Sequence, residues 1–410
     1  MKEPAPDPAL GRILRLVTAR SLNTFGRAVI NATVLWELYA RTHDKLVIAG
    51  IGFVQVLPVI LLFIPSGRLI DRSDRRMLTT VAAMLTGGVG IGLALASALV
   101  APVVVFYALL FVQGCVASVH NPAAASLIPL IIERSDLMRT NRISASLQEL
   151  AAIIGPALAG LALLVVAPSA VYGFIAITGL AAGVMYRSLP KPRAVAIDPA
   201  TSTARKDWRV GLRFIFKSPL LLPALTLDMF AVLFAGVTAL LPAIATDVLH
   251  TNAFGYGMLR ASQSAGAVLM AVIGGRIPPW QRPGRVLLIV VALFGLGTMA
   301  VGLSTSLPLT VVLLVVCGAL DNISVVIRLT LEQMVVPDAI RGRVSAVHYV
   351  FIGMSNELGA AESGLAADLV GTIPAIVGGG ALAILVVGIV AIKWRALSQM
   401  PPLADLKPAE

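Results

Sequence analysis

The sequence of 410 residues has few charges. Only 13% of its residues are Asp, Glu, Lys or Arg and 58% are hydrophobic, whereas an ordinary soluble domain has about 25% charged residues. This composition excludes a soluble globular protein and predicts a membrane protein. Because a spanning helix needs roughly 20 predominantly apolar residues, the chain has room for about a dozen spans joined by short connections.

Cysteine is almost absent, and histidine is rare. Cys115 and Cys317 both lie in apolar stretches, so they give no disulfide framework and are expected to be small buried hydrophobic side chains. The four histidines have no partner at ligand spacing, so no metal site is predicted. The sequence also lacks a G-x-x-x-x-G-K-[ST] run, which argues against ATP as the energy source. We therefore expect no cofactor.

The start of the chain has no recognisable signal peptide. Residues 1–18 contain charges and prolines but no separate apolar core followed by a small-residue cleavage site, so the first span is expected to direct insertion. The net charge of +11 could suggest nucleic acid, but the basic residues are scattered among apolar segments. Membrane orientation explains them better, and no nucleic-acid partner is expected.

Twelve apolar runs have the length of a membrane span. In the first half they cover residues 17–40, 46–68, 79–100, 103–130, 142–166 and 169–188. In the second half they cover residues 219–246, 254–276, 285–304, 307–334, 344–368 and 373–395. The sequence therefore predicts an all-α integral membrane protein with twelve transmembrane helices and both termini on one side.

The basic residues fall on one side of this topology. Of the 32 Lys and Arg residues, 27 lie in the terminal segments and in the loops on the same side, whereas the opposite loops contain only Arg41 and Lys45. Positively charged loops are retained in the cytoplasm during insertion. This predicts a multi-pass protein of the bacterial cytoplasmic (inner) membrane with cytoplasmic N and C termini.

A short motif recurs in the two halves. The run RTNRISA from Arg139 opens the fifth span and resembles IRGRVSA from Ile340, 201 residues later, which opens the eleventh. Recurrence at a fixed offset indicates a duplicated unit. We therefore predict two pseudo-symmetric six-helix bundles, residues 1–188 and 218–410, joined by a cytoplasmic linker, residues 189–217.

The end of this linker predicts an amphipathic helix. Basic residues recur every four positions from Arg205 to Lys217, beside an apolar series that includes Leu212 and Ile215. Such a helix could lie along the inner leaflet with its basic stripe toward anionic headgroups. A cytoplasmic extension of the seventh span without a lipid role explains the pattern equally well, and the sequence leaves both open.

Residues 67–78, GRLIDRSDRRML, form a charged segment between two long uncharged runs. The segment resembles the G-x-L-a-D-R-x-G-R-R-x-x-L loop between helices 2 and 3 of the major facilitator superfamily, although Asp74 stands where glycine is usual. Six positions match in register, namely Gly67, Leu69, Asp71, Arg72, Arg75 and Arg76, and Leu78 lies one position before the final leucine of the motif. The resemblance extends over the whole chain. It implies the major facilitator fold, in which the substrate site lies at the interface of the repeats near the midplane.

The resemblance also implies a conformational latch. In the family, the acid of this motif pairs with an arginine of the loop or with the start of helix 11 and holds the halves together when the site faces outward. Here the latch would comprise Gly67, Asp71, Arg72, Arg75 and Arg76, with Arg341 and Arg343 as further partners. A topology signal alone does not account for an acid among arginines, because acids contribute little to orientation.

A second motif lies in the fifth span. Gly155-Pro-Ala-Leu-Ala-Gly160 resembles the G-P-x-x-G-G motif of proton-coupled drug exporters in the superfamily, with Ala159 replacing one glycine. Pro156 is expected to kink the span, and Gly155 and Gly160 allow a neighbouring helix to approach closely. The motif favours export over uptake; the alternative is a purely structural kink.

Further segments, such as Arg20-Ser-Leu-Asn and the run ending at Pro219, resemble the subgroup that contains macrolide and enterobactin exporters. That resemblance implies a secondary exporter of drug- or siderophore-type amphipaths that exchanges them for protons. The alternative is a lipid or lysophospholipid transporter of the same fold. The expected partners are a small amphipathic substrate, protons and membrane lipids, and we expect a monomer.

Ionisable residues inside spans are costly and are functional candidates by default. Asp228, Glu357 and Asp321 lie near mid-depth of their predicted spans and are ranked in that order as proton-coupling candidates. Asp321 comes last because Arg328, seven residues later on the same helical face, is a plausible fixed partner. A structural hydrogen-bonding role is the alternative for each.

Arg27 is the basic residue near mid-depth. With Asn23 one turn before it and Asn31 one turn after it, Arg27 forms a polar stripe on the first span that must face the bundle interior. These three residues are the substrate-cavity candidates. Arg27 is expected either to neutralise Asp228 or Glu357, or to bind an acidic group of the substrate.

The other ionisable residues of the spans lie nearer an interface, where snorkelling or headgroup contact is a sufficient account of each and a functional role is the equally weighted alternative. They are Glu149, Arg260, Arg328, Glu332 and Glu362. A membrane-embedded enzyme would need a nucleophile and a base, or a metal pair, grouped at one depth. The sequence shows no such group, so enzyme activity is not expected.

Overall fold

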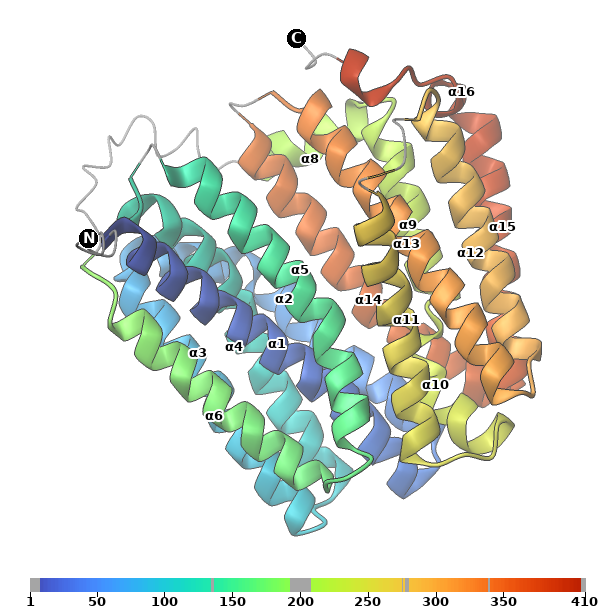
Figure 1. Cartoon of the computed structure of the whole chain (residues 1–410), viewed down its shortest axis with the longest axis horizontal. Helices are drawn as coiled ribbons and strands as arrows, with labels where there is room; N and C mark the ends of the chain where they lie inside the picture. Colours follow the sequence, from blue (N-terminus) through green and yellow to red (C-terminus); the bar gives the residue numbers. More distant parts are fainter. Residues whose placement is uncertain are drawn as a thin grey trace, which may run out of the picture. The chain divides into compact units, whose positions relative to one another are not determined.

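The computed structural model describes residues 8–133, 136–191, 208–274, 276, 280–337 and 340–406. All regular structure in these ranges is helical (Figure 1), which confirms the all-α prediction. The first half contains α1 (Pro8–Thr42), α2 (Lys45–Arg72), α3 (Arg75–Ala98), α4 (Val103–Ile131), α5 (Leu137–Ala162) and α6 (Pro168–Arg187).

The second half begins with a short helix, α8 (Trp208–Lys217). It continues with α9 (Leu221–Ala235), η2 (Val237–Leu240), α10 (Leu241–Ala243), η3 (Ile244–Val248), α11 (Ala253–Gly274) and α12 (Pro283–Leu303). The remaining elements are α13 (Leu307–Val335), α14 (Arg341–Val370), α15 (Thr372–Lys393), α16 (Arg395–Ser398) and η4 (Leu403–Asp405). All predicted spans but the seventh correspond to one long helix each.

The seventh predicted span is broken. α9 ends at Ala235, and a 3-10 turn, a short α-helical segment and a π-helical turn follow before Val248. Pro242 cannot donate a backbone hydrogen bond here. Thr298 Oγ1 donates to the carbonyl oxygen of Ala235 over 3.2 Å, which satisfies a carbonyl at the break, as burial in an apolar medium requires.

Nine helical segments within the described ranges are long and apolar enough to cross a membrane. The long helices α1, α11 and α14 are not among them. α1 carries Arg27 and Glu37, and α14 carries Glu357 and Glu362. Ionisable residues in the interior lower the hydropathy of α1 and α14, whereas α9 and α13 remain apolar enough despite Asp228 and Arg328.

Large apolar side chains are exposed along the apolar helices. Leu95 of α3, Val104 of α4, Ile289 of α12 and Ile392 of α15 are 57%, 67%, 57% and 77% exposed. Apolar patches of this extent mark contact with another apolar medium. A lipid bilayer provides that medium for a chain with this many apolar spans.

The chain divides into two compact units. Unit 1 consists of Met1–Leu38 and Val54–Ala196, and unit 2 consists of Tyr39–Phe53 and Ile197–Glu410. The division after Ala196 falls in the predicted linker, but residues 192–207 lie outside the described ranges, so the limits at 188 and 218 stay a prediction. The sequence did not indicate that residues 39–53 belong with unit 2.

Contacts inside unit 2 explain the membership of residues 39–53. Tyr39 donates its hydroxyl hydrogen to Asp247 Oδ2 over 2.5 Å. Gly52 lies against the backbone of α14, where a Cβ atom would collide with the carbonyl oxygen of Glu357 and the amide nitrogen of Ala361. This segment therefore packs on α14 at a distance that only glycine permits at position 52.

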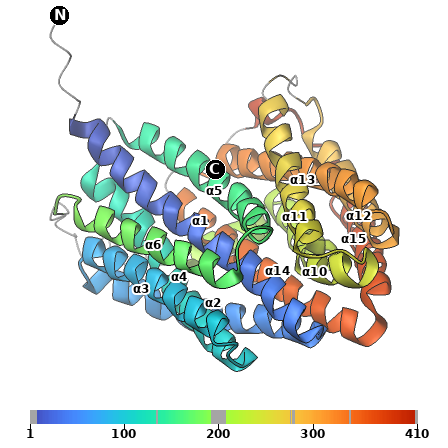
Figure 2. The same cartoon turned by 60° about the horizontal axis from the view of Figure 1, so that its bottom comes forward.

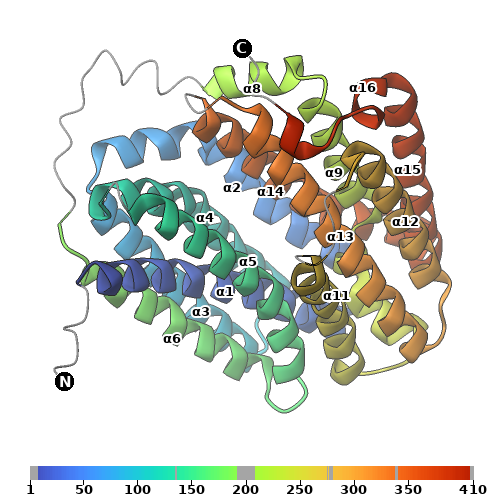
Figure 3. The ribbon, with the colours of Figure 1, turned by 45° about the horizontal axis from the view of Figure 1, so that its top comes forward.

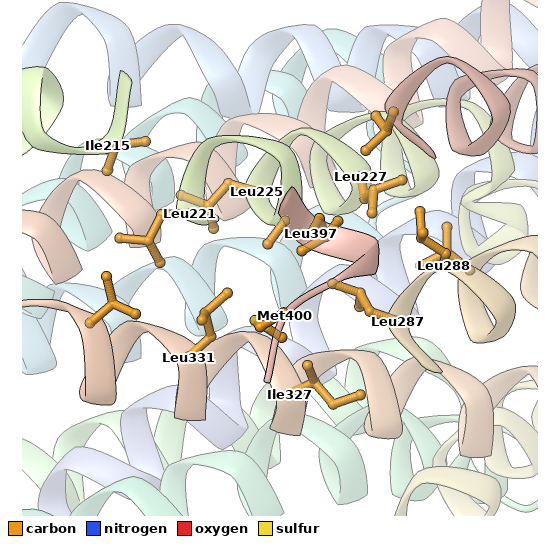
Figure 4. Close-up of a cluster of buried hydrophobic side chains, with 14 of the residues drawn as sticks. Ile215, Leu221, Leu225, Leu227, Leu287, Leu288, Ile327, Leu331, Leu397 and Met400 are labelled. Carbon is orange, nitrogen blue, oxygen red and sulfur yellow. The ribbon is translucent and has the colours of Figure 1, made fainter. Parts of the chain in front are cut away.

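Each unit has its own apolar core. In unit 1, α3 and α6 lie side by side (Figure 2), and a buried cluster joins α1, α3, α4 and α6 around Leu16, Leu127 and Tyr186. In unit 2, a larger cluster includes Leu227, Ile327 and Leu331 (Figure 4). These cores fix the helices that carry the buried polar residues described below.

The predicted amphipathic helix is α8 (Figure 3), which packs on α14 and α9. Its apolar side, including Leu212 and Ile215, covers the core of unit 2, whereas Arg209, Arg213 and Lys217 are exposed. The apolar stripe therefore contacts protein. The headgroup role of the basic stripe stays a prediction, and Arg205 lies outside the described ranges.

Candidate functional site

Asp228 of α9 and Arg328 of α13 meet inside unit 2. Asp228 Oδ1 and Arg328 Nη1 form an ion pair, and the two side chains are 9% and 5% exposed. Arg328 Nη1 also donates to Ser324 Oγ over 3.1 Å. Two charges that are shielded from water in this way stabilise each other, and removal of one leaves the other uncompensated.

A small pocket adjoins this ion pair. Asp321 and Ser324 line it together with Asp228 and Arg328. The space suffices for about one water molecule. The site can therefore hold a proton or a water, but not a drug-sized substrate.

The structure corrects two expectations about these residues. Arg328 was considered a fixed partner of Asp321, and Asp321 was ranked last for that reason, yet Arg328 forms its ion pair with Asp228, the candidate ranked first. Asp228 therefore has a cationic partner within unit 2, and a role of Arg27 in neutralising it stays a prediction. Snorkelling to an interface does not explain Arg328 either, since its side chain is buried in the pair.

Glu332 is a second buried acid of unit 2. It is 5% exposed, its Oε2 contacts His348 Nδ1, and its Oε1 accepts a hydrogen bond from Ser345 Oγ. The interface explanation for Glu332 is therefore wrong, and His348, isolated in the sequence, has an acidic partner in space. Ser345 and His348 both bind the carboxylate, so these contacts do not form a nucleophile–base pair.

Glu357 and Glu362 lie on α14 and are partly exposed. Glu362 Oε2 accepts a hydrogen bond from Ser363 Oγ over 3.4 Å. The backbone carbonyl of Glu357 contacts Gly52. Glu357 does not share the pocket that contains Asp228 and Asp321, so the three proton-coupling candidates are not one cluster.

The polar stripe of α1 lies in unit 1, and two of its residues bind side chains of α3 and α4. Asn23 is buried and donates to Thr86 Oγ1 of α3 over 3.5 Å. Arg27 is partly exposed, and its Nη1 donates to Asn121 Oδ1 of α4 over 3.0 Å. Asn31 is also partly exposed. Of the three substrate-cavity candidates, Asn23 is therefore committed to packing, and Arg27 and Asn31 are accessible within unit 1.

Glu37 is a buried acid that the sequence analysis missed. It lies on α1 and is 3% exposed; Ser97 Oγ donates to its Oε1 over 2.6 Å, and the Tyr172 hydroxyl donates to its Oε2 over 2.8 Å. The available signal was a single acid inside the apolar run ATVLWELY. Because the acid joins α1 to α3 and α6, it ties three helices of unit 1 together.

The side chain of Asp71 lies outside the described part of the structure, so the latch role is not tested. Arg75 Nη1 donates to the carbonyl oxygen of Ser126 over 3.3 Å, and Arg76 Nη2 donates to the carbonyl oxygen of Arg187. Gly67 and Arg72 are exposed. These two arginines of the predicted latch therefore fasten the start of α3 to α4 and α6.

Asp74 departs from the family pattern for a visible reason. It is the N-cap of α3, and its Oδ1 accepts from the backbone nitrogens of Arg76 and Met77 over 2.9 and 3.3 Å. An acidic N-cap satisfies unpaired amides and complements the helix dipole. The turn between α2 and α3 is thus closed by a side chain where the family uses glycine.

The motif of the fifth span lies within α5. The helix continues through Pro156. Gly155 packs against α1, because a Cβ atom there would come within 2.9 Å of Ala28 Cβ and 3.3 Å of the carbonyl oxygen of Phe25. Gly160 is buried near the end of the helix. The close helix approach expected at Gly155 is therefore present.

Comparison with protein families identifies the family of this chain. The model of the Major Facilitator Superfamily matches residues 16–360. The chain belongs to the major facilitator superfamily. It is accordingly a multi-pass membrane protein with the all-α major facilitator fold and a secondary transporter, as the loop motif at residues 67–78 predicted.

Relatives with assigned functions are similar over nearly the whole length. The enterobactin exporter EntS of Citrobacter koseri is 29% identical over 403 residues, which cover 95% of this chain and 94% of the relative. The EntS protein of Shigella boydii serotype 4 is 28% identical over 404 residues, which cover 94% and 92%.

Solved structures share the fold at low identity. A bacterial homologue of the human lysosomal transporter Spinster, in an inward-facing and occupied conformation, superposes with a TM-score of 0.71 at 14% identity, covering 95% of this chain and 98% of that chain. A D-xylose–proton symporter superposes with a TM-score of 0.72 at 15% identity, covering 93% and 97%. These similarities establish the fold and leave the substrate open.

Proposed function

We propose that the protein is a secondary exporter that moves small amphipathic molecules, of drug or siderophore type, in exchange for protons by alternating access. The observation that carries the proposal is the buried ion pair of Asp228 and Arg328 beside a water-sized pocket. Ionisable residues inside spans are rare and mark ion and proton pathways.

The geometry of this pair suits proton coupling. When Asp228 takes up a proton, it loses its charge and its attraction for Arg328, so the arrangement of α9 and α13 changes in free energy. A transporter couples a proton to its conformation when the proton binds the two states with different affinity. The Asp228 carboxylate, rather than the small pocket as a whole, is the proposed proton site.

Two observations support the proposed substrate class: the names of the similar proteins and the accessible Arg27 of unit 1. The full-length relatives are named as enterobactin exporters, and the accessible Arg27, which donates to Asn121, provides a cation suited to an acidic group. The positive charge of the loops supports cytoplasmic termini and the bacterial cytoplasmic membrane as the location. These assignments together describe an exporter that takes its substrate from the cytoplasm or the inner leaflet.

Reconstituted protein tests the proposal. Liposomes with an acidic interior should accumulate enterobactin, a macrolide or both, and nigericin, which collapses the pH gradient, should abolish accumulation. Asp228→Asn should abolish pH-driven accumulation, whereas Asp405→Asn, which removes an exposed acid of η4, should leave it unchanged. Movement of a lysophospholipid alone would identify a lipid transporter instead, and accumulation that ignores the pH gradient would refute antiport.

A further inference from the structure

Polar residues form a column along one face of α13. Asp321, Ser324, Arg328 and Glu332 follow one another at spacings of three, four and four residues, which places them on the same side of a helix. With a rise of about 1.5 Å per residue, the column is about 16 Å long. It runs from the pocket beside Asp228 to the last turn of α13.

The column ends at a second acid–base contact. Glu332 is buried and touches His348 and Ser345 from the first turns of α14. A buried carboxylate needs a proton or a cation, because an isolated charge in this environment is costly. We propose that Glu332 and His348 form a second proton-binding site and that Arg328 couples it to Asp228. The role of this second site in transport rests on the proposed antiport function, whereas proton binding by Glu332 and His348 does not.

Arg328 is placed to serve either acid. It forms the ion pair with Asp228, and Glu332 lies four residues later on the same helix, where Cβ atoms are about 5–6 Å apart. If Asp228 becomes protonated, it no longer attracts Arg328 electrostatically, and the guanidinium group turns to Glu332. The negative charge of Glu332 is then matched by Arg328, so Glu332 and His348 no longer need to retain a proton between them.

The proton count balances across this step. In the first arrangement of the proposal, Asp228 is ionised, Arg328 neutralises it, and Glu332 and His348 share one proton. In the alternative arrangement, Asp228 holds one proton, Arg328 neutralises Glu332, and His348 is neutral. One proton therefore leaves the second site for water as one is bound at Asp228, and the total charge of the buried groups does not change.

Other charged and titratable groups lie on the elements around the site. The elements packed against α13 carry Asp228 of α9, Tyr256 and Arg260 of α11, Arg285 of α12 and Asp405 of η4. The start of α14 carries Arg341 and Arg343, and the helices packed on α14 carry Arg209, Arg213 and Lys217 of α8 and Lys393 of α15. Arg341 Nη2 donates to the carbonyl oxygens of Gln333 and Val336, both over 3.2 Å, and so caps the end of α13. Arg285 Nε donates to the carbonyl oxygen of Ser398 over 3.1 Å. Both of these guanidinium groups are therefore engaged with carbonyl oxygens.

Infrared difference spectroscopy on the purified full-length protein, without substrate, tests the proposal. The carbonyl band of protonated carboxyl groups would be recorded as a function of pH for wild type and for Glu332→Gln. The wild type should show a component that Glu332→Gln removes. Asp228→Asn should move that component to lower pH by about one to three units, because the released Arg328 then stabilises ionised Glu332. His348→Gln should move it to higher pH, because a cationic partner is lost.

The opposite shifts separate proton binding from a structural role. Asp405→Asn is the matched control and should leave the component in place. A spectrum that Glu332→Gln does not change, or a component that keeps its midpoint in both Asp228→Asn and His348→Gln, would overturn the proposal. If Glu332→Gln does not yield folded protein, the two shifts in the other variants still decide the matter. Because no substrate is present, this result is independent of the exchange experiment that tests antiport.

Discussion

Arg328 of α13 forms an ion pair with Asp228 of α9 inside unit 2, and the two side chains are 5% and 9% exposed. The pair joins two helices at a depth where water does not compensate an unpaired charge. The ion pair therefore contributes to the stability of unit 2 whether or not Asp228 binds transported protons. Its effect on stability and its effect on transport can be measured separately.

We predict that either single neutralisation destabilises the protein. Arg328→Gln should lower the free energy of unfolding by about 3–5 kcal/mol, because it leaves Asp228 buried and unpaired. Asp228→Asn should lower it by less, because the released Arg328 can pair with Glu332. The double variant should lose clearly less than the sum of the two single losses. Thermal unfolding in detergent measures all three, and additive losses would show that the ion pair does not couple the two side chains.

The N-cap of α3 gives a second prediction. Asp74→Ala should cost about 0.5–2 kcal/mol, because the backbone nitrogens of Arg76 and Met77 lose their acceptor. Asp74→Asn should be nearly neutral, and Asp74→Gly, which restores the family residue, should cost only about a few tenths of a kcal/mol. Apparent melting temperatures should decrease from Asp74→Asn through Asp74→Gly to Asp74→Ala, and equal losses for alanine and asparagine would contradict the capping role.

The sequence predicted the helices well because the bilayer sets their length. An apolar run of about 20 residues has few alternatives to a spanning helix, so the bounds of α4 and α13 agree closely with the predicted spans. Loop charges and the motif at residues 67–78 were similarly informative, since they are local in the chain. The break after Ala235 was not predicted, because it depends on side chains such as Thr298 from another helix.

Partner choice could not be predicted from the sequence. Helical periodicity places Arg328 on one face of α13, but Asp321 on its own helix and Asp228 on α9 are both acceptable partners by that criterion. Only the packing of α9 against α13 selects Asp228. The same holds for Glu332 and His348, which lie on different helices, and for residues 39–53, whose place in unit 2 follows from contacts with α14 and η3.

The contact between α5 and α1 provides a third prediction. Gly155→Leu should destabilise unit 1 by about 1–3 kcal/mol, because the added side chain must displace Ala28 and the backbone of Phe25. Gly88 on α3 has nothing within 4 Å of a Cβ position, so Gly88→Ala should be neutral or slightly stabilising. Thermal unfolding of both variants checks this. Equal stability of Gly155→Leu and wild type would mean that α5 does not need glycine at this position.

The buried acid of unit 1 gives a fourth prediction. Tyr172→Phe removes a donor to Glu37 and should cost about 1.5–3 kcal/mol, the range for hydrogen bonds to charged groups. Ser188→Ala removes an exposed hydroxyl at the end of α6 and should cost almost nothing. Glu37→Gln, which keeps an acceptor oxygen, should be milder than Glu37→Ala. A Tyr172→Phe variant as stable as Ser188→Ala would show that this bond does not hold α1 to α6.

The latch motif gives the last prediction. Asp71→Asn should lower transport without lowering the amount of protein in the membrane, because the motif implies a charge-assisted bond that stabilises one conformational state. Such a bond contributes about 1.5–3 kcal/mol, so its loss should shift the balance of the two states and slow transport by about tenfold. Rates in proteoliposomes, normalised to reconstituted protein, measure the effect.

The appropriate control for Asp71→Asn, which lies in the last turn of α2, is Asp74→Asn at the N-cap of α3. Both changes remove one negative charge at the junction of α2 and α3, but asparagine at position 74 can still accept from the backbone nitrogens that Asp74 caps. A general loss of loop charge would slow both variants equally, whereas a latch that depends on Asp71 slows only the first. Unchanged transport by Asp71→Asn would therefore remove the latch role, and reduced abundance of that variant would assign the residue to folding or insertion instead.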